Sequence, residues 1–525
     1  MDKIQLLDCT LRDGAHLNRG MFGERMIRET ITDLIKAKVD IIEVGFFDNN
    51  SNDINSSFFN SIEAVRKILP KDRGSSKFSL MADYVDVSTI EPYDGTVDFF
   101  RLSFKRHRLE WALNAARILM DKGYKVYINP VNCNVYTDKQ YLEVIDKVNE
   151  LKPYGFSIVD TFGGLRLSDF AHFYYLVEGN LDPDIVIGAH LHENLGLAYS
   201  LAQHFLSIKA PKRNISIDGS LLGMGRVPGN LCLEQLMDHM NINYGTNYNI
   251  EPALDCIDDY IAPMKREIPW GYSITYALSG KYGIHRTYAE YLMGKNRLKT
   301  KDIQRLLSSI DKNHVEMFDE AYVESLYRSY LQTQYDEAAD IEWLSDTIRG
   351  KKVYIICPGG SIKAEKEKVT AYAESEDVIT ISVNFIPDFM NVDYVFCANK
   401  KRLGKLDERR DIPRLITSNL LEEVGENYAH AYSYNNCVYF NEVFCEDSTL
   451  MLLKILQTAG CRKLGIAGFD GFLGREKVYY VADYTKESGK NIEINKVIGI
   501  LQTSLSNMEI YYVTKSNYDP KAREK

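Results

Sequence analysis

Short apolar segments, separated by polar or glycine-containing stretches, recur through the first 223 residues of the chain. They are rich in β-branched and aromatic residues, which is typical of buried strands, and most are followed by a stretch of helical periodicity. Eight such segments can be counted, at residues 4–11, 39–47, 78–84, 97–104, 125–131, 155–162, 184–191 and 214–222. Alternating strands and helices form parallel sheets, and eight units of this size favour closure into a (β/α)₈ barrel, the TIM barrel. An open, doubly wound sheet is the alternative fold.

The pattern changes twice further along the chain. Residues 251–348 have mostly helical periodicity with tyrosine-rich and charged faces, and we expect a helical appendage there. A basic turn then precedes a new series of predicted strands, at residues 353–357, 378–383, 394–398, 414–417 and 463–467. The chain is therefore predicted to hold a barrel over residues 1–250, the appendage over residues 251–348 and a second, Rossmann-like α/β domain over residues 349–525.

Composition narrows the class of protein. A chain of 525 residues with 45% hydrophobic and 26% charged residues is typical of a soluble, multidomain globular protein. The formal net charge of -10 argues against a nucleic-acid binder, and no uncharged apolar run is long enough for a membrane span. The nine cysteines are scattered without a C-x-x-C pair, which favours reduced thiols, and no signal peptide is recognisable. These features predict a cytoplasmic protein.

The predicted strand ends carry the candidate chemistry. In a (β/α)₈ barrel, catalytic groups lie at the C-terminal ends of the strands. The first strand runs into Arg12, Asp13 and His16, and the seventh ends at His190 and His192. Because side chains alternate along a strand, the two histidine rings are expected to point the same way. Two histidines and one carboxylate match a metal site that leaves coordination positions for substrate and water. The alternative for an H-x-H pair is one ring in the core and the other on the surface.

Three motifs in this order resemble the DRE-TIM metallolyase superfamily and, within it, the 4-hydroxy-2-oxovalerate aldolases. They are D-C-T-L-R-D-G at residues 8–14, H-L-H-E-N-L-G-L at residues 190–197 and G-M-G-R-V-P-G-N at residues 223–230. His16 favours the aldolases within this superfamily, because the acyl-CoA lyases and synthases usually carry glutamine soon after R-D-G. The resemblance covers the barrel and implies a divalent-metal-dependent carbon–carbon lyase.

Individual roles follow from the resemblance. It implies that Asp13, His190 and His192 are metal ligands and that Asn230 is a fourth or outer ligand. Arg12 would steady an enolate, and His16 would be the general base, for which an ordinary histidine pKa of about 6.5 is suitable. Mn²⁺ suits these mixed ligands and would act as a Lewis acid on a 2-oxoacid, with Mg²⁺, Co²⁺ or Zn²⁺ as alternatives.

Further side chains are candidates with weaker support. Tyr282 matches the region in which the aldolases carry a tyrosine near the site, and it would protonate the enolate. Arg101, Asp160 and Glu43 lie at predicted strand ends. Arg101 could reach a substrate anion and the two carboxylates could orient ligands, or each could form a structural salt bridge.

The second domain opens with a strand, a P-G-G-S turn and a helix. Backbone amides at a helix start favour anions, so Gly359, Gly360 and Ser361 are candidates for binding a phosphate. With Asn384 after the second strand and Asp470 after the strand at residues 463–467, this order resembles the Rossmann-like domain of bacterial sialyltransferases. The resemblance implies a nucleotide or nucleotide-sugar as the ligand.

Three functions are compatible with the sequence. The first is a metal-dependent pyruvate aldolase that acts on a 2-oxoacid and an aldehyde, with a sugar aldehyde placing it in unusual-sugar or surface-polysaccharide biosynthesis. The second is an acyl-CoA Claisen lyase or synthase of the same superfamily. The third is a nucleotide-binding, glycosyltransferase-like protein with an inactive barrel, against which the retained charged motif residues count. Related barrels often pair through their helices, so a homodimer is expected by analogy.

Overall fold

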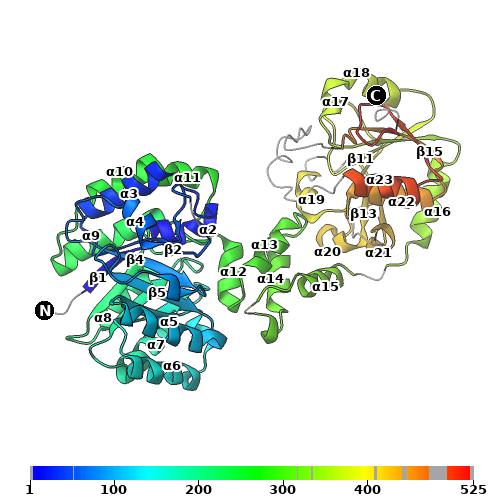
Figure 1. The fold of residues 1–525 in the computed structure, drawn as a ribbon. Coiled ribbons are helices and arrows are strands. Elements are labelled where there is room, and N and C mark those ends of the chain that lie inside the picture. The colour runs from blue at the N-terminus through cyan, green and yellow to red at the C-terminus, as the bar shows by residue number, and fades with distance from the viewer. Residues whose placement is uncertain are drawn as a thin grey trace. The chain divides into compact units, whose positions relative to one another are not determined.

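The computed structural model describes residues 4–50, 53–315, 317–332, 335–406, 409, 411–439, 446–471 and 494–520. The chain divides into two compact units, Met1–Arg286 and Thr287–Lys525 (Figure 1). The first unit ends with α10 (Glu251–Cys256), α11 (Ala262–Glu267) and α12 (Ile274–Tyr282). The second begins with α13 (Thr287–Gly294), α14 (Thr300–Ser308), α15 (Glu320–Leu331) and α16 (Ala338–Ile348). The helices expected to form one appendage are thus divided between the two units.

The first unit is a closed barrel of eight parallel strands, as the sequence predicted. The strands are β1 (Ile4–Asp8), β2 (Ile41–Phe47), β4 (Lys77–Asp83), β5 (Phe99–Phe104), β6 (Lys125–Pro130), β7 (Gly155–Asp160), β8 (Val186–Leu191) and β9 (Ile215–Gly219). Pairing of β1 with both β2 and β9 closes the barrel. The two-residue strand β3 (Phe58–Phe59) pairs with β2 beside the wall. Closure excludes the open doubly wound sheet for this unit.

Helices surround the barrel strands (Figure 1). They are α3 (Glu24–Lys36), α4 (Ile62–Ile68), α5 (Leu109–Asp121), α6 (Asp138–Leu151), α7 (Leu167–Asn180), α8 (Ala198–Ile208) and α9 (Leu233–Tyr244). In α3, Ile27, Ile31 and Leu34 are buried at helical spacing, so one face packs on the strands. The described segment between β4 and β5 holds only a 3₁₀ turn (Val87–Thr89) in place of a helix.

The inner surface of the barrel is layered. Outward-facing strand residues such as Ile42 and Phe100 belong to the large core that packs strands against helices. Their inward-facing neighbours form a separate apolar cluster, which contains Leu7, Cys9, Ile41, Phe99, Tyr127 and Val186. Two residues further toward the C-terminal ends of β2 and β5, the same inward register brings Glu43 and Arg101, which are buried. An apolar layer therefore lies beneath a layer of buried charges.

The second unit contains a Rossmann-like α/β domain, also as predicted. Its seven parallel strands run in the order β14-β13-β12-β11-β10-β15-β16. They are β10 (Lys352–Ile356), β11 (Val378–Val383), β12 (Tyr394–Cys397), β13 (Arg414–Thr417), β14 (His430–Tyr432), β15 (Lys463–Ala467) and β16 (Glu509–Tyr512). The described helices of this sheet are α17 (Ser361–Ala364), α18 (Lys366–Ala373), α19 (Lys400–Leu406), α20 (Leu421–Val424), α21 (Tyr434–Cys437), α22 (Ser448–Thr458) and α23 (Ile494–Thr503). The strand order reverses between β10 and β15.

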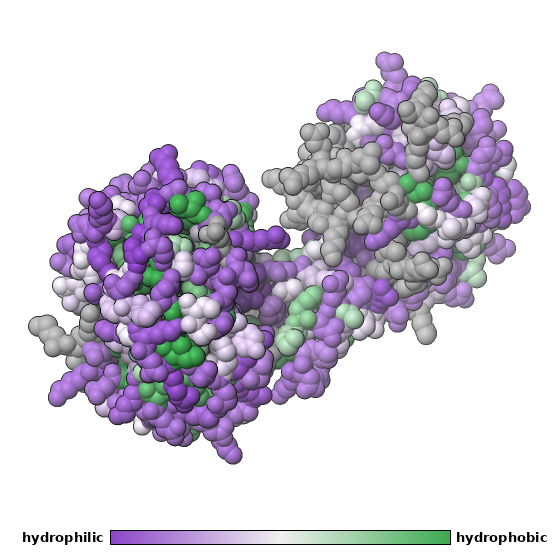
Figure 2. Space-filling model, viewed as in Figure 1, coloured by the Kyte–Doolittle hydropathy of each residue, from purple (hydrophilic) through white to green (hydrophobic). Residues whose placement is uncertain are grey.

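Two global expectations can be compared with the structure. Eight cysteines lie within the described residues, and all eight are free thiols. Among the described helices, none is both long and apolar enough to cross a membrane. The face of the first unit in Figure 2 is mostly hydrophilic, with its apolar residues in small, scattered groups.

Thr10 fastens the end of β1 to the loop after β9. Its hydroxyl donates to Asp8 Oδ2 at 2.5 Å and accepts from the backbone N–H of Leu221 at 2.9 Å. Burial raises the pKa of Asp8 to about 7, despite these bonds from Thr10. The bridge fixes the start of the D-C-T-L-R-D-G motif relative to the β9 loop.

We predict that Thr10→Val destabilises the barrel, because it leaves a carboxylate oxygen and a backbone amide buried without partners. Such groups typically cost about 1–3 kcal/mol each. Differential scanning calorimetry should show a lower transition temperature for Thr10→Val than for Thr10→Ser, which keeps the hydroxyl. Equal transition temperatures for the two variants would show that the bridge does not stabilise the fold.

Candidate functional site

The first motif forms two short helical turns above β1. The predicted strand at residues 4–11 ends at Asp8, and α1 (Thr10–Asp13) and α2 (Ala15–Asn18) follow. Arg12 and Asp13 are buried on α1, whereas the side chain of His16 on α2 is 43% exposed. The helical turns place all three side chains at the C-terminal end of the barrel, where catalytic groups of this fold lie.

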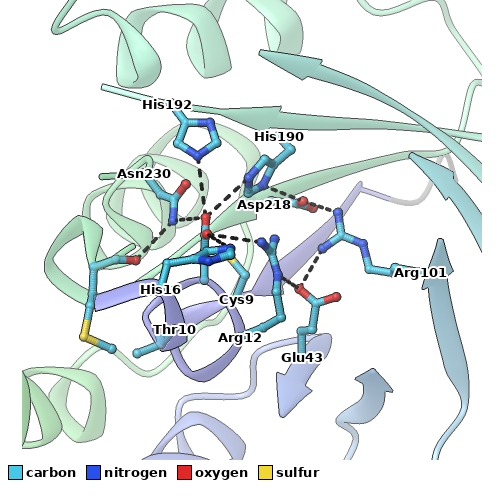
Figure 3. A network of polar contacts seen from close by, with 12 residues as sticks. Cys9, Thr10, Arg12, His16, Glu43, Arg101, His190, His192, Asp218 and Asn230 are labelled. Carbon is cyan, nitrogen blue, oxygen red and sulfur yellow. Dashed lines mark hydrogen bonds and ion pairs between the residues drawn. The ribbon is translucent and has the colours of Figure 1, made fainter. Parts of the chain in front are cut away.

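The predicted metal-ligating residues are brought together around the Asp13 carboxylate, and Figure 3 shows His190, His192 and Asn230 pointing toward one place. His190 Nε2 lies 3.5 Å and His192 Nε2 lies 3.7 Å from Asp13 Oδ2. Asn230 Nδ2 donates to the same oxygen at 2.6 Å. Both rings are buried, with centroids 4.8 Å apart, so neither histidine is a surface residue.

Hydrogen bonds to the other ring nitrogen orient each histidine. His192 Nδ1 lies 3.0 Å from the carbonyl oxygen of Asp160, so Nδ1 carries the proton and Nε2 keeps its lone pair. His190 Nδ1 lies 3.0 Å from Asp218 Oδ2. Asp160 thus orients a histidine through its backbone carbonyl and not, as expected, through its carboxylate, which accepts from the amides of Gly164 and Leu165. Fixed Nδ1 atoms are typical of metal-binding histidines.

Two acceptors at this centre lack hydrogen-bond donors. Within the described residues, His192 Nε2 and Asn230 Oδ1 are buried without a partner. Burial and the neighbouring His190 lower the pKa of His192 to about 3, so the ring is neutral. Burial tends to raise the pKa of Asp13, but Arg12, His190 and His192 hold it well below its ordinary value. An ionised carboxylate beside unpaired nitrogen and oxygen acceptors fits a divalent cation.

Cys9 is a further sulfur near this centre. Its Sγ, the Asp13 carboxylate and a His190 ring nitrogen all lie within 4.8 Å of one another. The thiol donates to the carbonyl of Gly219 at 3.3 Å, and burial raises its pKa well above the ordinary value. A protonated thiol is not a metal ligand. The raised pKa of the Cys9 thiol and the buried His192 Nε2 without a hydrogen-bond partner therefore favour His192 over Cys9 as the third ligand.

Buried ion pairs join the metal-ligating residues to Arg12 in a closed ring (Figure 3). Arg12 Nη1 lies 3.2 Å from Asp13 Oδ1, and Arg12 Nε lies 2.6 Å from Glu43 Oε2. Arg101 Nη1 lies 3.0 Å from the same Glu43 oxygen, and Arg101 Nη2 pairs with Asp218, which contacts His190. Sequence reasoning missed Asp218, although its place at the end of the eighth strand was a signal.

Of the two roles expected for Arg101, the structure supports the salt bridge. It is 1% exposed and lies between two carboxylates, so it is a buried salt-bridge residue and does not face a substrate anion. Removing one partner of such a pair leaves an uncompensated buried charge, which typically costs about 3–5 kcal/mol. Arg101 holds both Glu43, which orients Arg12, and Asp218, which orients His190.

His16 occupies the outer side of the centre. Its Nε2 lies 3.7 Å from Asp13 Oδ1, and its ring meets Phe46 edge-on with centroids 5.6 Å apart. Burial lowers the pKa of His16 to about 4, with Asp13 opposing this shift and nearby arginines contributing to it. The sequence-based expectation was about 6.5. His16 is therefore neutral at neutral pH, which is the form that accepts a proton.

Tyr282 is the last residue of α12, and its ring lies near the ammonium of Lys281, at 5.2 Å. The backbone of Gly280 in this helix packs closely against Gly164, in the loop after β7. This packing holds α12 at the C-terminal end of the barrel. A role for Tyr282 in protonation stays a prediction.

In the second unit, the protein's own side chains form hydrogen bonds with the turn that was predicted to bind an anion. Ser361 N donates to Asp470 Oδ2 at 2.9 Å, and the Ser361 hydroxyl bonds both Asp470 and Thr514. Gly359 N donates to the carbonyl of Gly468 at 3.0 Å. The Asp470 carboxylate thus occupies an amide of the Gly359-Gly360-Ser361 turn that a phosphate would use. Asn384 lies at the end of β11 with φ of 64°. Nucleotide binding stays a prediction.

We predict that His192→Ala weakens Mn²⁺ binding at least about 10-fold, because it removes a fixed nitrogen ligand. Burial opposes it, but bonds to Asp13 and Asp218 raise the pKa of His190, so a proton competes with the cation and affinity should increase with pH. Isothermal titration calorimetry at two pH values measures both effects. His172→Ala, on the exposed face of α7, is the matched control. Equal affinity of His192→Ala and the control would exclude His192 as a ligand.

Comparison with known proteins agrees with this architecture. Residues 3–257 match the HMGL-like family. A 4-hydroxy-2-oxovalerate aldolase from Shewanella halifaxensis (strain HAW-EB4) is 25% identical over 283 residues, covering 50% of this chain and 78% of the relative. A 2-isopropylmalate synthase from Methylacidiphilum infernorum (isolate V4) is 28% identical over 250 residues, covering 45% of this chain and 48% of the synthase. The match therefore spans about half the length of that synthase.

Among solved structures, the N-terminal domain of a candidate aldolase from Bacteroides vulgatus is similar, with 22% identity and a TM-score of 0.49. The alignment covers 55% of this chain and 96% of that domain. The sialyltransferase-like resemblance of the second unit stays a prediction. The family match runs from β1 to beyond β9 and confirms the superfamily that the three motifs indicated. Residues 3–257 of this chain, which contain the closed barrel, are therefore similar to the HMGL-like family.

Proposed function

We propose that the barrel is a divalent-metal-dependent pyruvate aldolase, which cleaves a 4-hydroxy-2-oxoacid to pyruvate and an aldehyde or catalyses the reverse condensation. The observation that carries the proposal is the neutral, partly exposed imidazole of His16, whose Nε2 lies 3.7 Å from the Asp13 carboxylate. Aldol cleavage needs such a base next to a centre that stabilises an oxyanion. The match to the aldolase of S. halifaxensis supports this proposal, because it covers 78% of that relative, whereas the match to the 2-isopropylmalate synthase covers 48% of the synthase.

Asp13, His190 and His192, with Asn230, would hold the cation, for which we propose Mn²⁺. The bound cation would supply Lewis acidity toward the 2-oxoacid. Neutral His192 and ionised Asp13 are already in the protonation states that ligation needs. Little proton release from these two residues would therefore accompany loading of the site.

The chain's own residues account for the proton transfers of cleavage. His16 Nε2 accepts the proton of the substrate's 4-hydroxyl, and the bond between carbons three and four breaks as the aldehyde carbonyl forms. The electron pair passes to carbon three, giving the enolate of pyruvate. A proton then returns to carbon three, for which we propose Tyr282 as the donor, and pyruvate is released.

Arg12 provides the fixed positive charge for the enolate oxygen. Its guanidinium is held by Glu43 and Asp13 and is only 6% exposed, so it need not reorient as charge develops. Glu43 in turn is fixed by Arg101. Charge stabilisation by a group that is already oriented is typically worth more than the same contact in water.

We predict that His16→Ala lowers kcat for pyruvate release by about 10²–10⁴-fold, the usual contribution of a general base. The assay couples pyruvate to lactate dehydrogenase, with 4-hydroxy-2-oxovalerate as substrate and with metal-stripped or Mn²⁺-loaded protein. Turnover should need Mn²⁺, and His172→Ala should match the unmodified protein. Full activity of His16→Ala would contradict its role as base, and release of free thiol from an acyl-CoA and a 2-oxoacid would favour Claisen chemistry instead.

A further inference from the structure

Two neighbouring barrel strands carry polar side chains on their inward face beyond the layer of buried charges. On β4, Leu80 and Ala82 pack in the outer core, so the next residue, Asp83, faces inward. On β5, Ser103 lies two residues beyond Arg101, which points into the barrel. The strands pair in parallel with Asp83 opposite Ser103. The two side chains therefore lie side by side at the C-terminal end of the barrel.

A series of contacts connects this pair to the proposed base. The His16 ring meets Phe46 edge-on, with centroids 5.6 Å apart, and Phe46 packs in one apolar cluster with Met81 and Ala15. Met81 precedes Asp83 by two residues on the same face of β4, so Asp83 lies about 7 Å further toward the rim. One apolar layer thus separates the Asp83 carboxylate from His16.

The residue that follows Asp83 holds the end of β4 in place. Tyr84 has a φ of 53°, a left-handed conformation that is strained for a bulky side chain. The Arg108 guanidinium lies 3.3 Å from the centre of the Tyr84 ring, and Trp111 meets this ring edge-on with centroids 5.4 Å apart. Backbone strain of this kind clusters at active sites, where the surrounding structure maintains it. These contacts therefore fix the position of Asp83 at the rim.

The Asp83 carboxylate is accessible and has no ion-pair partner in the described part of the chain. Its side chain is exposed, and no described lysine, arginine or histidine nitrogen lies within 4.0 Å of its oxygens. Burial nevertheless raises the pKa of Asp83, with a hydrogen bond from Ser103 opposing the rise. An accessible carboxyl group that protein surrounds on several sides lies in a recess, where it can meet a small molecule.

A second acceptor at the same end of the barrel lacks a donor. Asn132 follows β6, the strand that pairs with β5, and has a left-handed backbone with φ of 58°. Its side chain is only 6% exposed, and among the residues that the structure describes its Oδ1 has no hydrogen-bond partner. Buried acceptors usually have a donor, which a bound molecule can supply.

These acceptors correspond to one half of the substrate in the proposed reaction. His16 removes the proton of the 4-hydroxyl, so the substituent on carbon four, which becomes the aldehyde, begins next to His16. A carboxylate beside this substituent would repel an anion, and an apolar chain would remove its water without replacing the hydrogen bonds. A hydroxyl group can donate to Asp83 and accept from Ser103, so it satisfies both side chains.

We propose that the aldehyde half of the substrate carries hydroxyl groups, one of which donates to Asp83 beside Ser103 while another donates to Asn132. This inference rests on the proposed aldolase function and names its substrate class, a hydroxylated, sugar-like aldehyde. Asp83 determines specificity and takes no part in the proton transfers of cleavage.

The test measures condensation of pyruvate with matched aldehydes on the Mn²⁺-loaded, full-length protein. Glyceraldehyde is compared with propanal, and erythrose with butanal, so that the members of each pair differ only in hydroxyl groups. We expect kcat/KM for the hydroxylated member to exceed that of its partner by about 10–100-fold, because the deoxy compound leaves polar groups unpaired. Asp83→Leu, which removes the acceptor but keeps the approximate shape, should reduce this ratio about 10-fold, and Asp83→Asn should reduce it less. Asn132→Gly, which tolerates the left-handed backbone, should reduce it about 2–10-fold.

Asp121→Leu, at the exposed last residue of α5, is the matched control and should leave the ratio unchanged. The KM of pyruvate should be the same in Asp83→Leu as in the unmodified protein, which separates lost specificity from a damaged fold. Ratios near one for both pairs, or a ratio that Asp83→Leu does not change, would overturn the inference while leaving the aldolase intact. Failure to condense any aldehyde, hydroxylated or not, would contradict the proposed function, and the inference would fall with it.

Discussion

Buried charges inside a barrel must be paired, and this constraint organises the first unit. Arg12, Asp13, Glu43, Arg101 and Asp218 are all nearly inaccessible to solvent. Each of them contacts an opposite charge, and His190 closes the ring between Asp218 and Asp13. An unpaired charge at such a depth would cost several kcal/mol, so the side chains have little freedom. The ring therefore fixes Arg12, which we propose binds the oxyanion, and His190, a proposed metal ligand, in one geometry.

The ring is supported from below by the apolar layer of Leu7, Ile41, Phe99, Tyr127 and Val186. Strand alternation makes this support automatic, since the residue two positions beyond an inward apolar side chain also points inward. Ile41 is thus followed by Glu43, and Phe99 by Arg101. The apolar layer thus positions the buried charges, and these charges in turn position Arg12 and His190. The partly exposed side chain of His16 lies on the outer side of this ring.

Periodicity predicted much of this arrangement and failed where the determining contacts are distant in sequence. All eight barrel strands were predicted, and so was the convergence of Asp13, His190 and His192, because strand ends in a closed barrel lie at one rim. The place of Asn230 beside them was implied by the family resemblance. For Arg101 the sequence left a substrate anion and a salt bridge as alternatives, since its partners Glu43 and Asp218 lie on other strands. The edge strands β14 and β16 were missed because their sequences, H-A-Y and E-I-Y-Y, carry little of the β-branched, apolar pattern that marked the other strands. The glycine turn of the second unit suggested an anion, but only the structure places Asp470 against it.

The central claim is that this ring prepares the barrel to stabilise the enolate of pyruvate on a divalent cation. Exchange of the pyruvate methyl protons in D₂O, followed by mass spectrometry, measures enolate formation without any aldehyde. The account predicts exchange that requires Mn²⁺ and protein together and that slows by about 10²–10³-fold in Arg12→Met. Exchange no faster with the Mn²⁺-loaded protein than with Mn²⁺ alone would contradict it.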